Sequence, residues 1–174
     1  MKRFLQLLLL GALALAPVAA EARKHDPLTS DEIDQLREVA LEPEKRLKLL
    51  ADFARLRLTA IEEARTPKKP ATENPRSLHD LMEDFLAVYD ELDENIGMYE
   101  DRQSDLRKAL KPVLLADNEF HARLEGLQHN LTPEERTECD FVISSVVEAI
   151  SMGTVEHKKL LLEQEASTKN KKKK

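Results

Sequence analysis

Two residues near the middle of the chain, His79 and Glu83, have the types and the spacing to hold a divalent cation. They stand four positions apart, so a helix would place them one turn apart on the same face. Asp80 and Asp84 repeat that spacing one residue later. Both pairs fit a solvated acidic helix face, where carboxylates need no metal. We therefore expect no metal site here, and His79 and Glu83 are only weak candidates.

Other patterns of metal or catalytic chemistry are missing from the sequence. A di-iron helical bundle needs Glu-x-x-His motifs on facing helices, and the chain has none. The segment Asp93–Gly97 resembles a calcium loop, but its glycine comes one position early and no glutamate closes the loop. There is no Gly-x-Ser-x-Gly motif. We therefore predict that the protein is not an enzyme, with no catalytic residue and no cofactor.

The single cysteine, Cys139, cannot form a disulfide within the chain. It stands beside Phe141 and Val142 in a predicted helix, so we interpret it as a small buried apolar residue. A reactive thiol or an intermolecular disulfide is the alternative. Either way, the fold must depend on core packing.

The composition favours helices throughout. The chain has 174 residues, enough for one domain, with 41% hydrophobic residues, 4% aromatic residues and 4 glycines. Leucine, alanine, glutamate, lysine and arginine, which favour helices, dominate the sequence. The formal net charge of −6 becomes −8 if Lys2 and Arg3 leave with a signal peptide. An acidic body of this kind argues against nucleic acid as a specific partner.

Residues 1–22 are organised as a signal peptide. Two basic residues precede an apolar run from Phe4 to Ala16, and Pro17 then leads into small residues. Cleavage after Ala20 or after Ala22 would fit a small-x-small site. The apolar run is shorter than the roughly 20 residues of an ordinary transmembrane helix, and an uncleaved anchor is the alternative. We therefore predict an exported protein, periplasmic or extracellular, with no integral membrane segment after signal removal.

The rest of the chain is organised around a heptad stripe between Leu78 and Leu110. Its members are spaced by alternating four and three residues, which keeps one side of a helix against a partner helix. All of them except Gln103 are apolar or aromatic. The stripe consists of Leu78, Met82, Phe85, Tyr89, Leu92, Ile96, Tyr99, Gln103, Leu106 and Leu110.

The same segment carries a dense acidic surface. Between residues 80 and 101 there are nine acidic residues and no lysine or arginine. Most of them fall outside the stripe, so we interpret them as a candidate interaction face. This acidic face consists of Asp80, Glu83, Asp84, Asp90, Glu91, Asp93, Glu94, Glu100 and Asp101. The preceding helix, residues 44–65, leans basic, and pairing it with the acidic helix would relieve repulsion.

Capping residues and prolines divide the chain into helices. Thr29, Ser77 and Thr132 are each placed to cap a helix start. Pro43 either breaks a helix or opens the next one, and the proline-rich segment 66–76 predicts a loop. The predicted organisation is a signal peptide (1–22), a polar leader (23–28), a helical bundle domain (29–166) and a disordered lysine-rich tail (167–174).

The predicted fold is all-α, an antiparallel bundle of three long helices with coiled-coil-like packing. The second of these helices contains Pro112, and the heptad stripe passes through it in phase, with Asp117 as the polar exception beyond it. We therefore predict one helix, kinked near Pro112. A complete turn at Pro112, which would give four helices, is the alternative.

Two resemblances bear on the class of protein. The stretch from Leu28 to Arg65 and the later segments HDLMEDF, DELDEN and LRKALK resemble a family of exported bacterial helical proteins of unknown function. That resemblance covers nearly the whole mature chain and implies no activity. The helix starts at Leu28-Thr29 and Leu131-Thr132 also resemble the LTxxQ motifs of periplasmic stress chaperones and metal-resistance sensors, although the glutamine is absent here.

Together these features predict a non-enzymatic exported helical protein that acts as a binding or structural module in the cell envelope or outside the cell. A protein partner, or self-association through the heptad stripe, would suit such a module. The alternative is a periplasmic chaperone-like or metal-responsive helical stress protein.

Overall fold

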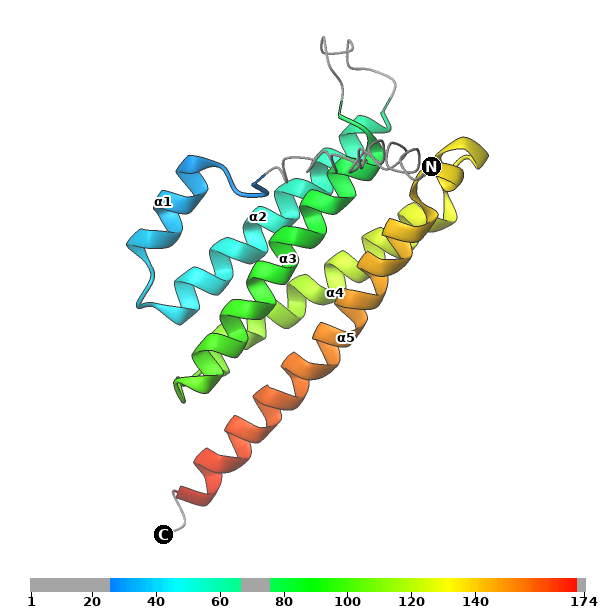
Figure 1. Cartoon of the computed structure of the whole chain (residues 1–174). Helices are drawn as coiled ribbons and strands as arrows, with labels where there is room; N and C mark the ends of the chain where they lie inside the picture. The colour runs from blue at the N-terminus through cyan, green and yellow to red at the C-terminus, as the bar shows by residue number, and fades with distance from the viewer. Residues whose placement is uncertain (1–25, 67–75, 172–174) are drawn as a thin grey trace, which may run out of the picture.

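The structure, a computed structural model, describes residues 26–66 and 76–171. Within these ranges it contains five helices and no strand, so the predicted all-α class is confirmed (Figure 1). The helices are α1 (Ser30–Glu38), α2 (Pro43–Ala64), α3 (Leu78–Asp101), α4 (Arg107–His129) and α5 (Pro133–Lys171). The predicted signal peptide, most of the polar leader and most of the proline-rich loop lie outside the described residues.

The helix starts follow the predicted capping signals. Thr29 and Ser77 each accept a hydrogen bond from the backbone N–H three residues on, and the side chain of that residue bonds back, which completes a capping box. Thr132 and Glu135 make the same reciprocal pair ahead of α5, at 3.2 and 2.8 Å. Pro43 is the first residue of α2, where its missing N–H costs no intrahelical hydrogen bond.

The break in the central segment lies elsewhere than predicted. The single helix kinked near Pro112 is wrong, and so is a turn at Pro112, because α3 ends at Asp101 and α4 begins at Arg107. Gln103 in the connection has a φ of 57°, a left-handed conformation that ends a helix. The N–H of Ser104 bonds back to the carbonyl of Tyr99 at 3.0 Å and satisfies one of the last carbonyls of α3.

A distant residue holds this turn in place. The side chain of Gln164 accepts a hydrogen bond from the N–H of Leu106 at 2.8 Å and donates one to the carbonyl of Ser104 at 3.0 Å. Gln164 is 58 positions from Leu106, so the local sequence gives no sign of this contact. Pro112 meanwhile lies inside α4, where it removes the hydrogen bond to the carbonyl of Lys108.

The four longer helices enclose one hydrophobic core. α2 packs against α3 and α4, α5 packs against α4 and α3, and α1 contacts α2. Phe85 and Phe120 meet edge to face, with ring centroids 5.5 Å apart. The residues of the predicted heptad stripe are buried, except that Leu78 is half-buried and Gln103 is exposed in the turn. Cys139 is buried, as predicted.

Ion pairs join the helices along the edges of this core. Arg55 bonds Glu119 at 3.0 and 3.1 Å, and Arg123 bonds Glu62 at 2.7 and 2.8 Å, so α2 and α4 are linked twice. Partly exposed pairs of this kind each contribute at most about 1 kcal/mol to stability. These ion pairs instead favour one register of α2 against α4, because each cation meets its carboxylate only in that register.

The last helix is longer than predicted. α5 continues to Lys171, so the predicted disorder of the tail is wrong for residues 167–171. Alanine and lysine favour a helix here, and the hydroxyls of Ser167 and Thr168 bond back to carbonyls four residues earlier. The C-terminal end of α5 extends past the other helices (Figure 1). Within the described ranges, no helix combines the length and the apolar character needed to cross a membrane.

Candidate functional site

A chain of hydrogen-bonded polar side chains crosses the otherwise apolar core. The Tyr89 hydroxyl donates to Oδ1 of Asp117 at 3.1 Å, and Oδ2 of Asp117 lies 2.9 Å from Nδ1 of His157. Nε2 of His157 lies 3.1 Å from Oδ1 of Asp93. The first three residues are at most 2% exposed, whereas the side chain of Asp93 is 49% exposed. This polar network therefore links the interior of the protein to its surface through one histidine.

Each buried member occupies an inward position of its own helix. Tyr89 lies on the heptad stripe of α3, Asp117 on α4 and His157 on α5. Gly153 on α5 makes room for the network, since a Cβ atom there would lie 2.5 Å from the Tyr89 hydroxyl oxygen. Asp117 is visible in the sequence as a polar exception in an apolar stripe. The sequence prediction missed His157, although its spacing from Gly153 and from Leu160 places it on the inner side of the helix.

The network sets the protonation of its members. Burial by itself would lower the pKa of His157, but the hydrogen bonds and charges of Asp117 and Asp93 outweigh burial and raise that pKa to about 9. His157 is therefore a cation at neutral pH. Burial, together with the charge of Asp117, raises the pKa of the Tyr89 hydroxyl well above its usual value, so the phenol stays protonated and donates. In the described part of the chain, every buried side-chain nitrogen and oxygen has a hydrogen-bond partner.

The network contains a carboxylate–histidine pair whose ring nitrogens both contact carboxylates of the protein. Both ring nitrogens of His157 are engaged, by Asp117 and by Asp93. The two best-formed surface hollows lie around the starts of α2 and α4, and neither is lined by a residue of the network. A general base must come within hydrogen-bonding reach of its substrate. We interpret the network as a device that favours one packing of α3, α4 and α5, since a slipped arrangement would leave buried charges unpaired.

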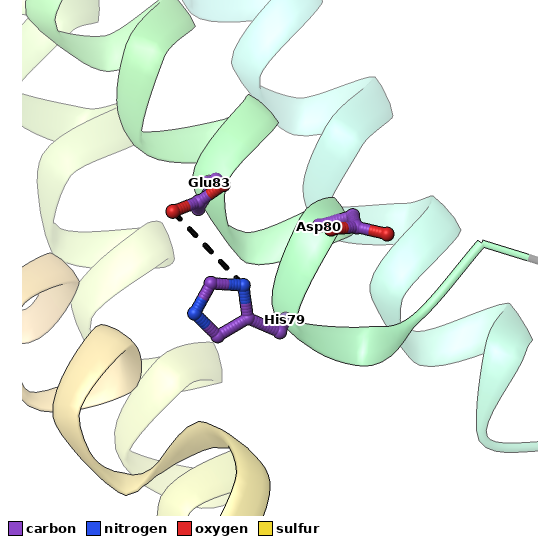
Figure 2. A group of neighbouring side chains, drawn as sticks. All are labelled: His79, Asp80 and Glu83. Atoms are coloured by element: carbon purple, nitrogen blue, oxygen red, sulfur yellow. Dashed lines mark ion pairs between the residues drawn. The ribbon is translucent and has the colours of Figure 1, made fainter. Parts of the chain in front are cut away.

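The weak metal candidates do come together. His79 Nδ1 lies 4.0 Å from Oε1 of Glu83, and one ligand atom from each of His79, Asp80 and Glu83 lies within 4.8 Å of the others. Figure 2 shows the imidazole and the Glu83 carboxylate next to each other on one side of α3. Asp80 also takes part in the capping box with Ser77. All three side chains belong to the start of one helix and are partly or fully exposed, so an ion there would keep most of its water and bind weakly.

Several members of the predicted acidic face make contacts within the fold. Three of its members meet basic groups of other segments: Asp84 binds Arg76, Glu91 lies 3.9 Å from Arg46, and Asp93 binds His157. The remaining six side chains are exposed: Asp80, Glu83, Asp90, Glu94, Glu100 and Asp101. The pairing of the basic α2 with the acidic α3 takes place through Arg46, which also donates to Asn95 at 2.6 Å.

An apolar stripe on the outer side of α5 is the surface feature that the sequence prediction missed. Four large apolar side chains on this helix are mostly exposed: Phe141 (86%), Met152 (58%), Val155 (68%) and Leu162 (57%). They lie 11, 3 and 7 residues apart in the sequence, all intervals that keep them on one side of a helix. The signal was hidden because α5 also carries a buried apolar stripe on its other side. Ser145, Glu148 and Lys159 lie between these four residues at heptad spacing. We call all seven residues the outer stripe.

Comparisons with protein-family models, with curated proteins and with solved structures find no match.

Proposed function

We propose that the protein is a non-enzymatic, exported helical module that acts by binding, in the cell envelope or outside the cell. The observation that carries the proposal is the outer stripe of α5. Single apolar side chains are common on protein surfaces, but an aligned row of large ones is typical of an interaction site. The stripe lies on the longest helix, which also extends beyond the rest of the fold (Figure 1).

We infer that α2 to α5 form a bundle of two antiparallel pairs, α2 with α3 and α4 with α5, that serves as a rigid support for this surface. Contacts between opposite ends of neighbouring helices favour that arrangement. Arg46 near the start of α2 bonds Asn95 near the end of α3, and Gln164 near the end of α5 accepts a hydrogen bond from the N–H of Leu106 just before α4. The inward side chains of these helices are buried against one another, so a partner would meet the outer faces of the helices.

The polar network is consistent with a non-catalytic role. His157 and Asp117 form a carboxylate–histidine pair, yet both are buried and hydrogen-bonded to protein groups. Their charges stabilise the packing of three helices when they are paired. The protein would then act by binding a partner at its surface.

Export is supported by the organisation of residues 1–22, and it can be tested directly. N-terminal sequencing of the protein recovered from the envelope or the medium should begin at Glu21 or at Arg23, the residues after the two predicted cleavage points. Recovery only in the cytoplasm with Met1 or Lys2 at the N-terminus would contradict the proposed localisation.

The binding role is tested by placing a photo-crosslinking amino acid at Val155 of the protein in the cells that produce it. We expect covalent adducts at this position, because a binding partner would cover it. Leu115 on α4 is the matched control, since it is also a large exposed apolar residue, 72% exposed against 68% for Val155. Adducts that form at Val155 but not at Leu115 would support the proposal. If no adducts form at Phe141, Val155 or Leu162, the proposal is rejected.

A chaperone-like role is the second candidate, and the exposure of Phe141 and its neighbours on the outer stripe is the observation in its favour. Unfolding clients expose apolar segments that such a row could cover. The purified protein should then suppress the aggregation of a heated client enzyme at near-stoichiometric ratio, and a Phe141→Ser, Val155→Ser variant should not. If the wild-type protein and the variant suppress aggregation equally well, the outer stripe does not bind the client.

A further inference from the structure

The outer stripe of α5 has the spacing of a coiled-coil seam. Positions 141, 145, 148, 152, 155, 159 and 162 are separated by alternating four and three residues. They lie nearly opposite the buried stripe that includes Val146, Ile150 and His157. A helix with seams on opposite sides can pack against neighbours on both of them. Among residues 26–66 and 76–171, the helices that contact α5 are α3 and α4, and they cover its inner seam.

The charged members of the outer stripe are placed symmetrically. Glu148 precedes Met152 by four residues, and Lys159 follows Val155 by four. Positions 148, 152, 155 and 159 are therefore spaced by four, three and four residues in either direction along the helix. When the helix is reversed, the glutamate takes the place of the lysine and the lysine that of the glutamate. If two copies of α5 lie antiparallel about the midpoint between Met152 and Val155, each Glu148 faces Lys159 of the second copy.

The same pairing also matches the apolar members by size. Each Met152 lies opposite Val155 of the second copy, in the two central layers. Further out, Leu162 comes opposite Ser145, so a large side chain faces a small one. The paired positions of the outer stripe would run from Ser145 to Leu162 of each copy, a length of about 26 Å at the helical rise per residue.

Other pairings of the same two helices are less favourable. A parallel pair would place Glu148 beside Glu148 and Lys159 beside Lys159, and like charges repel. Sliding the antiparallel pair by one heptad would place Glu148 opposite Met152, and a charge in an apolar layer without a partner is costly. Within one chain, Lys159 lies 4.0 Å from Glu163, and both side chains are well exposed, so the lysine is free to turn toward a second copy.

We propose that the occupant of the outer stripe is a second copy of this chain, paired through antiparallel α5 helices in the register centred between Met152 and Val155. The proposal deepens the binding role proposed above and rests on it. The charge pattern is the reason to choose a second copy over an unrelated partner, because Glu148 and Lys159 complement each other only when the helix meets itself in reverse.

Charge exchange tests the pairing in the mature protein by sedimentation velocity over a range of concentrations. The wild-type protein should show a monomer–dimer equilibrium. Glu148→Lys and Lys159→Glu each place like charges opposite one another, and we expect each to raise the dimer Kd about tenfold. The double variant E148K/K159E restores opposite charges and should restore the dimer. Lys108→Glu on α4, also exposed, is the matched control and should leave the Kd unchanged.

Disulfide formation tests the orientation. In an antiparallel pair a cysteine at position 148 of one copy meets a cysteine at position 159 of the other, whereas two cysteines at position 148 stay about 16 Å apart. Mixing Glu148→Cys with Lys159→Cys should therefore give a mixed disulfide dimer under mild oxidation, and either variant alone should not. Cys139 is buried and does not interfere. Rapid disulfide formation by Glu148→Cys alone would mean parallel pairing and would overturn the proposal.

The remaining outcomes separate this inference from the proposed function. A wild-type protein that stays monomeric at all concentrations overturns the dimer. If Val155 then still forms adducts that contain another protein, the binding role stands with a different partner. If the protein is monomeric and no position of the outer stripe forms an adduct, both proposals fail.

Discussion

The Nδ1 atom of His157 lies 2.9 Å from Oδ2 of Asp117, and neither side chain is more than 2% exposed. Two residues 40 positions apart in the chain thus share a buried, charge-assisted hydrogen bond. Removing one partner of such a pair leaves the other charge uncompensated, which typically costs about 3–5 kcal/mol of stability. The stability of this fold therefore depends on the charge of one histidine.

We expect the free energy of unfolding to fall as the solution becomes alkaline. The pKa of histidine in an unfolded chain is about 6.5, whereas the pKa of His157 in the folded protein is about 9. The stabilisation is fully present below the unfolded value and is lost as the pH rises through the folded one. Linkage makes the loss on the order of 3 kcal/mol. Urea unfolding followed by circular dichroism, from slightly acid to alkaline pH, measures it.

Histidine variants provide the control for this pH dependence. His157→Asn should be less stable at neutral pH, and its stability should fall less steeply between neutral and alkaline pH, because one titrating group is gone. His129→Asn, at an exposed position near the end of α4, should retain the slope of the wild-type protein. An unchanged slope in His157→Asn would show that another group is responsible.

Gly153→Ala should destabilise the protein, because the new methyl group would lie 2.5 Å from the Tyr89 hydroxyl oxygen. We expect a loss of about 1–3 kcal/mol, the usual range for overpacking in a core. Gly97→Ala is the matched control, since a Cβ at Gly97 meets nothing within 4 Å. That change should raise stability by roughly 0.5–1 kcal/mol, because alanine favours the helix. Thermal unfolding measures the change in the melting temperature of each variant. Equal changes in the two variants would contradict the close approach of Tyr89 to Gly153.

Leu92→Asp should prevent stable folding. Leu92 is completely buried on the heptad stripe of α3, so the new carboxylate would be placed in the core without a partner. We expect a loss of about 4 kcal/mol or more. Leu56→Asp on α2, where the side chain is 59% exposed, should be close to neutral. Far-ultraviolet circular dichroism distinguishes the two variants, and normal helicity of Leu92→Asp would mean that this side of α3 is not the packed one.

Metal titration tests whether His79, Asp80 and Glu83 bind a divalent ion. Because its three side chains remain at the surface, we expect no divalent ion to bind there more tightly than about millimolar affinity. Isothermal titration calorimetry with Zn²⁺ and Mn²⁺ on the wild-type protein and on His79→Ala with Glu83→Ala measures this. A tighter isotherm that disappears in the double variant would favour the metal-responsive alternative.

Much of the fold can be predicted because its signals are local. The caps at Thr29, Ser77 and Thr132 depend on groups three residues apart, and the heptad stripe of α3 repeats within each turn or two. The prediction of one continuous helix across residues 101–107 is wrong for a different reason. Pro112 is a strong helix breaker in isolation, but the turn forms at residues 102–106, where Gln164 supplies hydrogen bonds from a distant helix.

The candidate site was less predictable for the same reason. His79 and Glu83 were recognisable from the sequence because they lie on one helical turn, and the structure does place them together. His157 was not, because its partners Asp117 and Asp93 come from two other helices. The outer stripe of α5 was also hidden, since the sequence does not show which of two apolar sides of a helix will be covered.

By itself, the sequence determined the all-α class, the starts of α1, α3 and α5, the buried stripe of α3 and the burial of Cys139, because backbone capping and periodic burial act over a few residues. Only the tertiary structure decided where α3 ends, that α5 continues to Lys171, that His157 is charged between two carboxylates, and which side of α5 faces solvent. Most of these depend on which helices become neighbours. Contacts across 40 or more positions, such as that between Asp117 and His157, form only when the whole core packs.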